Sequence, residues 1–164
     1  MVIYVVRHAY AYEHGDPRWP DDSRRPLSPE GAARFGEAVA LLAERGFSPQ
    51  AVATSPYVRC RQTAEIVAAQ AGVAEVTELA ALEPGSDLAA LVAWTQAVSA
   101  AGAERVAWVG HSPDVSHLAA ALIGDGDASL RFAKGAVAAI RMHGGVEPGR
   151  GELLWLASAK LLGV

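Results

Sequence analysis

The chain alternates between short apolar runs and longer segments that have the spacing of amphipathic helices. The run from Val2 to Val6 is apolar at every position, which is typical of a strand buried on both faces of a sheet. Similar short runs predict further strands at 51–53, 75–77, 105–109, 136–140 and 152–156. Capping residues and glycines mark the bounds of four predicted helices, at 28–45, 55–72, 87–102 and 112–123.

Three of these helices begin at a Ser-Pro pair, in which serine can cap the helix and proline suits its first turn. The pairs are Ser28–Pro29, Ser55–Pro56 and Ser112–Pro113. We expect Ser28 and Ser112 to act as N-caps and the second helix to begin at its own pair. The polar segment 9–27, which contains three prolines, is predicted to be a loop.

Strands separated by helices favour an α/β fold. We predict a three-layer α/β/α sandwich, with a mostly parallel central sheet and helices on both faces. The last two strands have no helix between them, so that pair is free to be antiparallel. No linker, repeat or low-complexity tract interrupts the pattern, and residues 1–164 are predicted to form one domain.

Composition and charge exclude several classes of protein. The chain is 51% hydrophobic and 20% charged, which suits a folded protein with a buried core. A net charge of −4 argues against a nucleic-acid partner. The single cysteine, Cys60, excludes an internal disulfide. Apolar stretches end well before the ~20 residues of a membrane span, and no signal-peptide pattern precedes Arg7. We expect a cytoplasmic protein without a membrane partner, and the charge and single cysteine are compatible with a monomer.

Basic side chains follow three of the predicted strands at the point where each ends. Arg7 and His8 follow the first strand, Arg59 lies in the first turn of the helix after the second, and His111 follows the strand at 105–109. Because the carboxyl ends of parallel strands lie at one edge of a sheet, we expect these four side chains and two helix N-termini to converge.

Such a set of groups suits a phosphoryl group. Guanidinium groups offer planar pairs of donors to phosphate oxygens, and helix N-termini add unpaired N–H groups. A neutral histidine can attack phosphorus, and a second one can stabilise the charge of the transition state. The arginines can compensate the phosphate charge, so we expect no metal and no cofactor. Cys60 lies between two arginines but lacks a Cys-x5-Arg loop, so we interpret it as a buried helix residue.

Four segments in this order resemble the histidine phosphatase superfamily, which includes the phosphoglycerate mutases, and most of all its small SixA-type branch of phosphohistidine phosphatases. They are Val5–Ala9, Arg25–Gly31, Ser55–Ala64 and Gly110–Pro113. The resemblance implies a three-layer α/β/α fold and the role of phosphorylated nucleophile for His8. It further implies that Arg7, Arg59 and His111 bind the phosphoryl group, and we add Ser112 as a substrate-binding residue.

The chain also departs from the family pattern. Ala9 replaces a glycine that many members have, and Tyr10 stands where a charged residue is common. Larger members carry a glutamate acid in a long insertion, and here that region is short. Glu83 is the candidate acid that replaces it, with Glu78 and Asp16 as the other candidates.

These features lead to one main hypothesis and two alternatives. We predict a metal-independent phosphatase that dephosphorylates phosphohistidine on a protein, because a nitrogen leaving group depends less on an acid and an uncapped pocket admits a protein. The first alternative is a phosphatase of a small phosphate ester. The second is a non-catalytic module that binds phosphoryl groups, although the presence of both histidines and both arginines argues against it.

Overall fold

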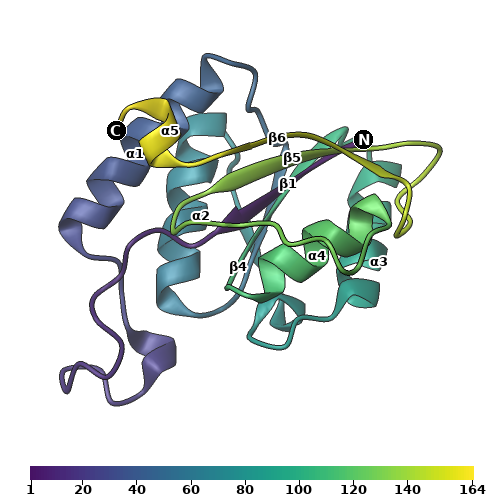
Figure 1. Ribbon diagram of the computed structural model, residues 1–164. Coiled ribbons are helices and arrows are strands. Elements are labelled where there is room, and N and C mark those ends of the chain that lie inside the picture. The colour runs from purple at the N-terminus through teal and green to yellow at the C-terminus, as the bar shows by residue number, and fades with distance from the viewer.

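A six-stranded sheet lies at the centre of the computed structural model, which describes residues 1–164 (Figure 1). The strands are β1 (Val2–Arg7), β2 (Ala51–Thr54), β3 (Val76–Glu78), β4 (Arg105–Gly110), β5 (Val137–Met142) and β6 (Gly151–Ala157). Their order across the sheet is β3-β2-β4-β1-β5-β6. The first four run parallel, whereas β5 is antiparallel to both β1 and β6. The predicted mostly parallel sheet is confirmed.

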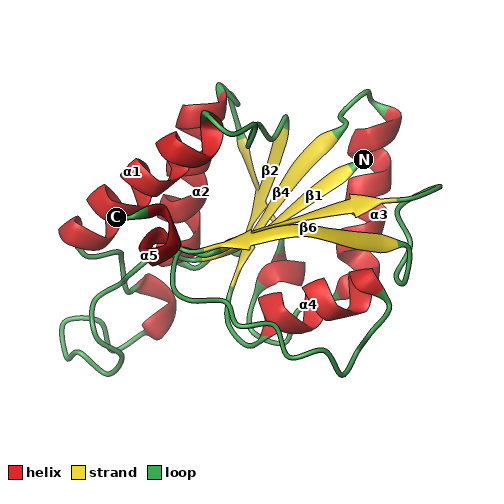
Figure 2. Cartoon of the chain, turned by 45° about the horizontal axis from the view of Figure 1, so that its top comes forward, coloured by secondary structure: helices red, strands yellow, loops and turns green.

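Helices cover both faces of this sheet, as predicted (Figure 2). They are α1 (Pro29–Ala43), α2 (Val58–Ala71), α3 (Leu88–Ala100), α4 (Asp114–Ile123) and the short α5 (Ala159–Leu162). The helices α1, α2 and α5 lie on one face and α3 and α4 on the other, and each face has its own apolar core. Phe35 and Val67 belong to the first core, and Leu91 and Trp108 to the second. No helix is both long and apolar enough to cross a membrane.

The starts of the helices agree with the sequence pattern in some places and differ in others. Ser28 caps α1 as predicted, since its Oγ accepts a hydrogen bond from the Gly31 N–H at 3.0 Å. The expected start of α2 at Ser55–Pro56 is wrong, because the helix begins at Val58. The expectation that Ser112 caps α4 is also wrong: Pro113 occupies the N-cap position, and no side chain caps this helix.

The register of the parallel strands brings their carboxyl ends level with one another. Arg7 of β1 pairs with Gly110 of β4, and the His8 N–H donates to the Gly110 carbonyl at 3.0 Å. On the other side of β4, Thr54 of β2 pairs with Val109. The residues that follow these three strands therefore meet at the same edge of the sheet.

Candidate functional site

His8 is buried at the end of β1 and presents one ring nitrogen for chemistry. Its side chain lies 2.8 Å, measured from Nδ1, from the Ala9 carbonyl oxygen. Because a carbonyl can only accept, Nδ1 carries the proton and Nε2 keeps its lone pair. Burial lowers the pKa of His8 to about 3, and the charge on Arg59 acts in the same direction. His8 is therefore a neutral imidazole at neutral pH, as a nitrogen nucleophile must be.

Arg59, the second residue of α2, is 5% exposed and is held from one side by Asp22. Its Nη1 donates to the main-chain carbonyl of Asp22 at 2.8 Å, and its Nη2 lies 3.1 Å from the Asp22 carboxylate. The same Nη2 lies 3.3 Å from Nδ1 of His111. The Nε–H of Arg59 is buried and has no hydrogen-bond partner. The guanidinium is thus fixed beside His111, and its Nε–H is unused.

His111 lies directly after β4 and faces His8. The centroids of the two rings are 5.5 Å apart. Since Nδ1 accepts from Arg59, the proton of the neutral ring is on Nε2, which donates to Ser55 Oγ at 2.9 Å. Burial, followed by the charge on Arg59, lowers the pKa of His111 to about 4. The ring is neutral at neutral pH, and its single N–H donor is at Nε2.

Arg7 directly precedes His8 in the chain, and its side chain lines a cleft. Its Nη1 donates to the Phe132 carbonyl at 2.7 Å, while its Nε is buried without a partner. The cleft has a volume of about 510 Å³, and Arg7, Tyr10 and Ser112 contribute to its lining. Ser112 is exposed and lies outside any helix, and its side chain does not cap α4.

Glu83 follows a short 3-10 helix, Ala80–Leu82, that packs beside the end of β4. The side chain of Glu83 is half-buried and makes no hydrogen bond or ion pair. Its loop is tied to α4, because the Gly85 N–H donates to the Asp114 carboxylate at 3.1 Å. Unlike Glu83, the two other candidate acids each form an ion pair. Glu78 lies 3.7 Å from Arg61, and Asp16 lies 2.6 Å from Arg18.

Asp22 is the residue of this site that the sequence did not single out. Its carboxylate lies 2.8 Å from Arg25 Nε, 3.0 Å from His14 Nδ1 and 3.1 Å from Arg59 Nη2. The hydrogen bond from Arg25 is the main reason that the pKa of Asp22 is held well below its usual range. The only signal in the sequence was an acidic pair, 21–22, within a loop whose side chains follow no period.

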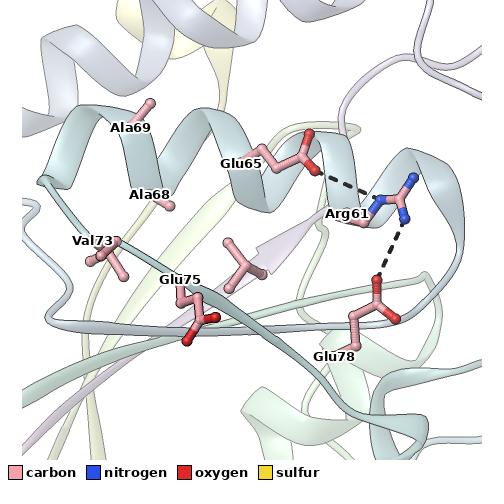
Figure 3. Close-up of a pocket in the computed structure, with 9 residues that line it drawn as sticks. Arg61, Glu65, Ala68, Ala69, Val73, Glu75 and Glu78 are labelled. Carbon is pink, nitrogen blue, oxygen red and sulfur yellow. Dashed lines mark ion pairs between the residues drawn. The ribbon is translucent and has the colours of Figure 1, made fainter.

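Cys60 and Arg61, which follow Arg59, belong to other environments. Cys60 is fully buried, and burial raises the pKa of its thiol to about 12, which agrees with its interpretation as a buried helix residue. Arg61 faces a separate cavity of about 370 Å³ between α2 and β3 (Figure 3). There it lies 3.7 Å from both Glu65 and Glu78. With three glutamates in its lining, this cavity does not suit an anion.

No group of three or more His, Cys, Asp or Glu side chains is arranged so that it could hold a metal ion. The arrangement at the strand ends instead combines a neutral imidazole with two guanidinium groups and a second imidazole. Each guanidinium keeps one buried N–H without a partner. A tetrahedral oxyanion is a ligand whose oxygens such donors can bind.

Comparisons with known proteins agree with this chemistry. Residues 3–84 match the model of the histidine phosphatase superfamily, branch 1. The chain is 34% identical over 122 residues to an uncharacterized protein of a Picosynechococcus species, covering 74% of this chain and 73% of that protein. It is 28% identical over 159 residues to the phosphohistidine phosphatase SixA of Escherichia coli K12, covering 96% and 94% respectively.

A solved structure extends the likeness to the whole fold. The structure of the protein histidine phosphatase SixA complexed with tungstate has a TM-score of 0.83 and 27% identity, and the match covers 99% of both chains. The sequence match, the shared fold and the paired histidines and arginines at the strand ends lead to the same conclusion. This chain belongs to the histidine phosphatase superfamily and is a phosphohydrolase.

Proposed function

We propose that this phosphatase removes the phosphoryl group from phosphohistidine on a protein, through a transient phosphohistidine on His8. The observation that carries the proposal is the state of His8. Its Nδ1 proton is committed to the Ala9 carbonyl, its pKa is lowered to about 3, and its Nε2 lone pair is free. Next to it are the two guanidinium groups and the second imidazole, which can hold and stabilise a phosphoryl group.

The reaction proceeds in two displacements at phosphorus. In the first, Nε2 of His8 attacks phosphorus, a new N–P bond forms, and the bond from phosphorus to the substrate imidazole breaks as that imidazole takes a proton from solvent. In the second, water attacks the same phosphorus, the bond to Nε2 of His8 breaks, and inorganic phosphate leaves with the protons of that water, so the neutral ring is restored. We assign the binding of the phosphoryl oxygens to Arg7 and Arg59, each of which keeps an N–H donor that no acceptor of the protein takes. His111 contributes its Nε2–H donor. This N–H donates to Ser55 Oγ in the free protein and would donate to a phosphoryl oxygen when substrate is bound.

Two residues complete this assignment. We propose Glu83 as the acid for leaving groups that need one, because it follows the 3-10 helix that packs against Gly110, beside His111. We propose Ser112 as a contact for the substrate, because it lines the same cleft as Arg7. A phosphoramidate is the substrate class that fits. Its leaving nitrogen is basic enough to take a proton from solvent, so its departure depends less on Glu83 than that of an alkoxide does.

A single-turnover trap tests the proposal. The protein is mixed with a ³²P-labelled histidine-phosphorylated protein and, separately, with a labelled small phosphate ester. Each reaction is quenched in alkali, in which phosphohistidine survives. We expect label on His8 from the phosphoprotein, no label in His8→Ala, and label retained in His117→Ala, which removes an exposed histidine of α4. Full activity of His8→Ala would overturn the nucleophile assignment, and label from the ester alone would overturn the protein substrate.

A further inference from the structure

The cleft beside Arg7 carries two more cations. Of the residues that line it, Arg131 and Lys134 are basic in addition to Arg7, and none is acidic. The chain as a whole has a net charge of −4, so this cleft differs in sign from the protein around it. Its volume of about 510 Å³ extends well beyond what one phosphoryl group fills.

The two cations of the cleft have no acidic partner within the protein. Neither Arg131 nor Lys134 forms an ion pair or a side-chain hydrogen bond, whereas six other arginines pair with carboxylates. Those six are Arg18, Arg25, Arg59, Arg61, Arg141 and Arg150. Lys134 instead lies with its ammonium 5.0 Å from the centroid of the Tyr10 ring, and Tyr10 is itself 43% exposed. One aromatic ring and two cations without an acidic partner therefore line the same cleft.

The segment that carries these cations is fixed relative to the nucleophile. The Gly135 N–H donates to the His8 carbonyl, and the Arg7 N–H donates to the Ala136 carbonyl, each at 3.0 Å. Between the two cations, Phe132 is 3% exposed and its carbonyl binds the Arg7 side chain. The backbone next to both cations is therefore hydrogen-bonded to the end of β1 that carries His8.

We propose that Arg131 and Lys134 recognise acidic residues that flank the phosphohistidine of the substrate protein. This inference rests on the proposed function, since it takes His8 to be the site of phosphoryl transfer. Arginine and lysine bind carboxylates by charge-assisted hydrogen bonds, and complementary charge selects among partners. A phosphoprotein places side chains on both sides of its phosphohistidine, and the cleft that Arg7 lines is also lined by the exposed Tyr10.

The test compares two phosphohistidine peptides of equal length, one with aspartate and glutamate beside the phosphohistidine and one with glutamine. It uses the double variant Arg131→Gln/Lys134→Gln and a matched control, Arg45→Gln/Lys160→Gln, which removes the same charge from exposed positions elsewhere. We expect the wild type to prefer the acidic peptide in kcat/KM, through KM. In the cleft variant, the ratio of kcat/KM for the acidic peptide to that for the glutamine peptide should be about fivefold smaller, which is the scale of two exposed ion pairs. The control should keep the preference, and added salt should weaken it.

Two further measurements separate this inference from the proposed function. Hydrolysis of phosphoramidate, which has no flanking residues, reports the chemistry alone. Fluorescence anisotropy with an unphosphorylated acidic peptide reports binding without turnover. Equal kcat/KM for both peptides in the wild type would overturn the inference while leaving the phosphatase chemistry intact. The inference would also be overturned if the cleft variant kept the wild-type preference for the acidic peptide and lost activity only toward a small phosphate ester that carries a second anionic group. Binding of the acidic peptide that depends on both cations, without hydrolysis of any P–N bond, would overturn the proposed function instead.

Discussion

The carboxylate of Asp22 lies 3.1 Å from Nη2 of Arg59, and the main-chain carbonyl of Asp22 accepts a second hydrogen bond from Nη1 at 2.8 Å. Arg25 and His14 hold the same carboxylate from the other side. One residue of the loop between β1 and α1 therefore sets the orientation of an arginine at the start of α2. We infer that Asp22 is a positioning residue, which acts on phosphate binding through Arg59.

Replacement of Asp22 tests this role. Asp22→Ala should lower kcat/KM by about tenfold, the scale of one hydrogen bond to a charged group, and mainly through KM. Asp22→Asn should recover part of the loss, because an amide oxygen can still accept from Arg59. The control is Asp21→Ala, whose carboxylate binds Ser23 and does not contact Arg59. Steady-state kinetics in which both variants match the wild type would remove Asp22 from the site.

Glu83 is tested by changing the leaving group. An alkoxide needs a proton as it departs, and a general acid is worth about a hundredfold or more in rate. Glu83→Gln should therefore slow hydrolysis of an alkyl phosphate by that factor and slow hydrolysis of a phosphohistidine peptide far less. Glu65→Gln, which alters an exposed glutamate of α2 near Arg61, is the matched control. If Glu83→Gln slows both substrates equally, the residue does not act as the acid.

The buried histidines predict a loss of stability in acid. The pKa is about 3 for His8 and about 4 for His111, both below the ~6.5 of an unfolded chain. Between these values the unfolded state binds more protons, so the free energy of unfolding falls as the pH falls from 6.5 toward 4. Each histidine contributes about 1.4 kcal/mol per pH unit within this window.

Urea denaturation at pH 7 and pH 5 measures this loss. We expect His8→Ala to lose about 2 kcal/mol less than the wild type between the two pH values. His117→Ala, at an exposed position of α4, should lose as much as the wild type. At pH 5 the depressed pKa of Asp22 does not contribute, since that contribution is lost only below the usual carboxyl range. Equal losses in all three proteins would show that His8 is not buried in its neutral form.

Two glycines of α1 predict opposite effects on stability. A methyl group on Gly31 would overlap the carbonyl oxygen of Tyr10, which also accepts a hydrogen bond from the Ser28 N–H. Gly31→Ala should therefore destabilise the protein by about 1–3 kcal/mol. Gly36 has open space at the same atom, so Gly36→Ala should stabilise it by about 0.5–1 kcal/mol through helix propensity. Thermal unfolding of both variants checks the signs, and a destabilised Gly36→Ala would contradict the argument.

The parts of the site that follow strands could be predicted from the sequence. Arg7, His8 and His111 lie at or just after the end of an apolar run. A run that is apolar at every position is typical of a strand in a parallel sheet covered on both faces, so the end of each run marks the edge of the sheet. Their convergence then follows from the shared edge of the strands. The antiparallel pair at the end of the chain was left open by the sequence, because a short connection permits that arrangement without requiring it.

The parts that depend on loops could not be predicted in the same way. Asp22, Arg131 and Lys134 lie in segments without a hydrophobic period, so nothing in the pattern indicates that Asp22 contacts Arg59 or that the two cations line the cleft. The start of α2 was misplaced for a related reason. The hydroxyl of Ser55 binds His111 instead of capping a helix, and that partner comes from a distant part of the chain.

The pairing of Arg7 with Gly110 also sets how far the chain can tolerate changes in length. Side chains alternate between the faces of a strand, so one residue added to or removed from the middle of Val2–Arg7 would put either His8 or the core residues before it on the wrong face of the sheet. The turn between β5 and β6 lies at the other end of the sheet, because Arg141 pairs with Val2. Insertions at the exposed glycines 144–145 would therefore leave the reaction geometry unchanged, and that turn is the place to attach new sequence.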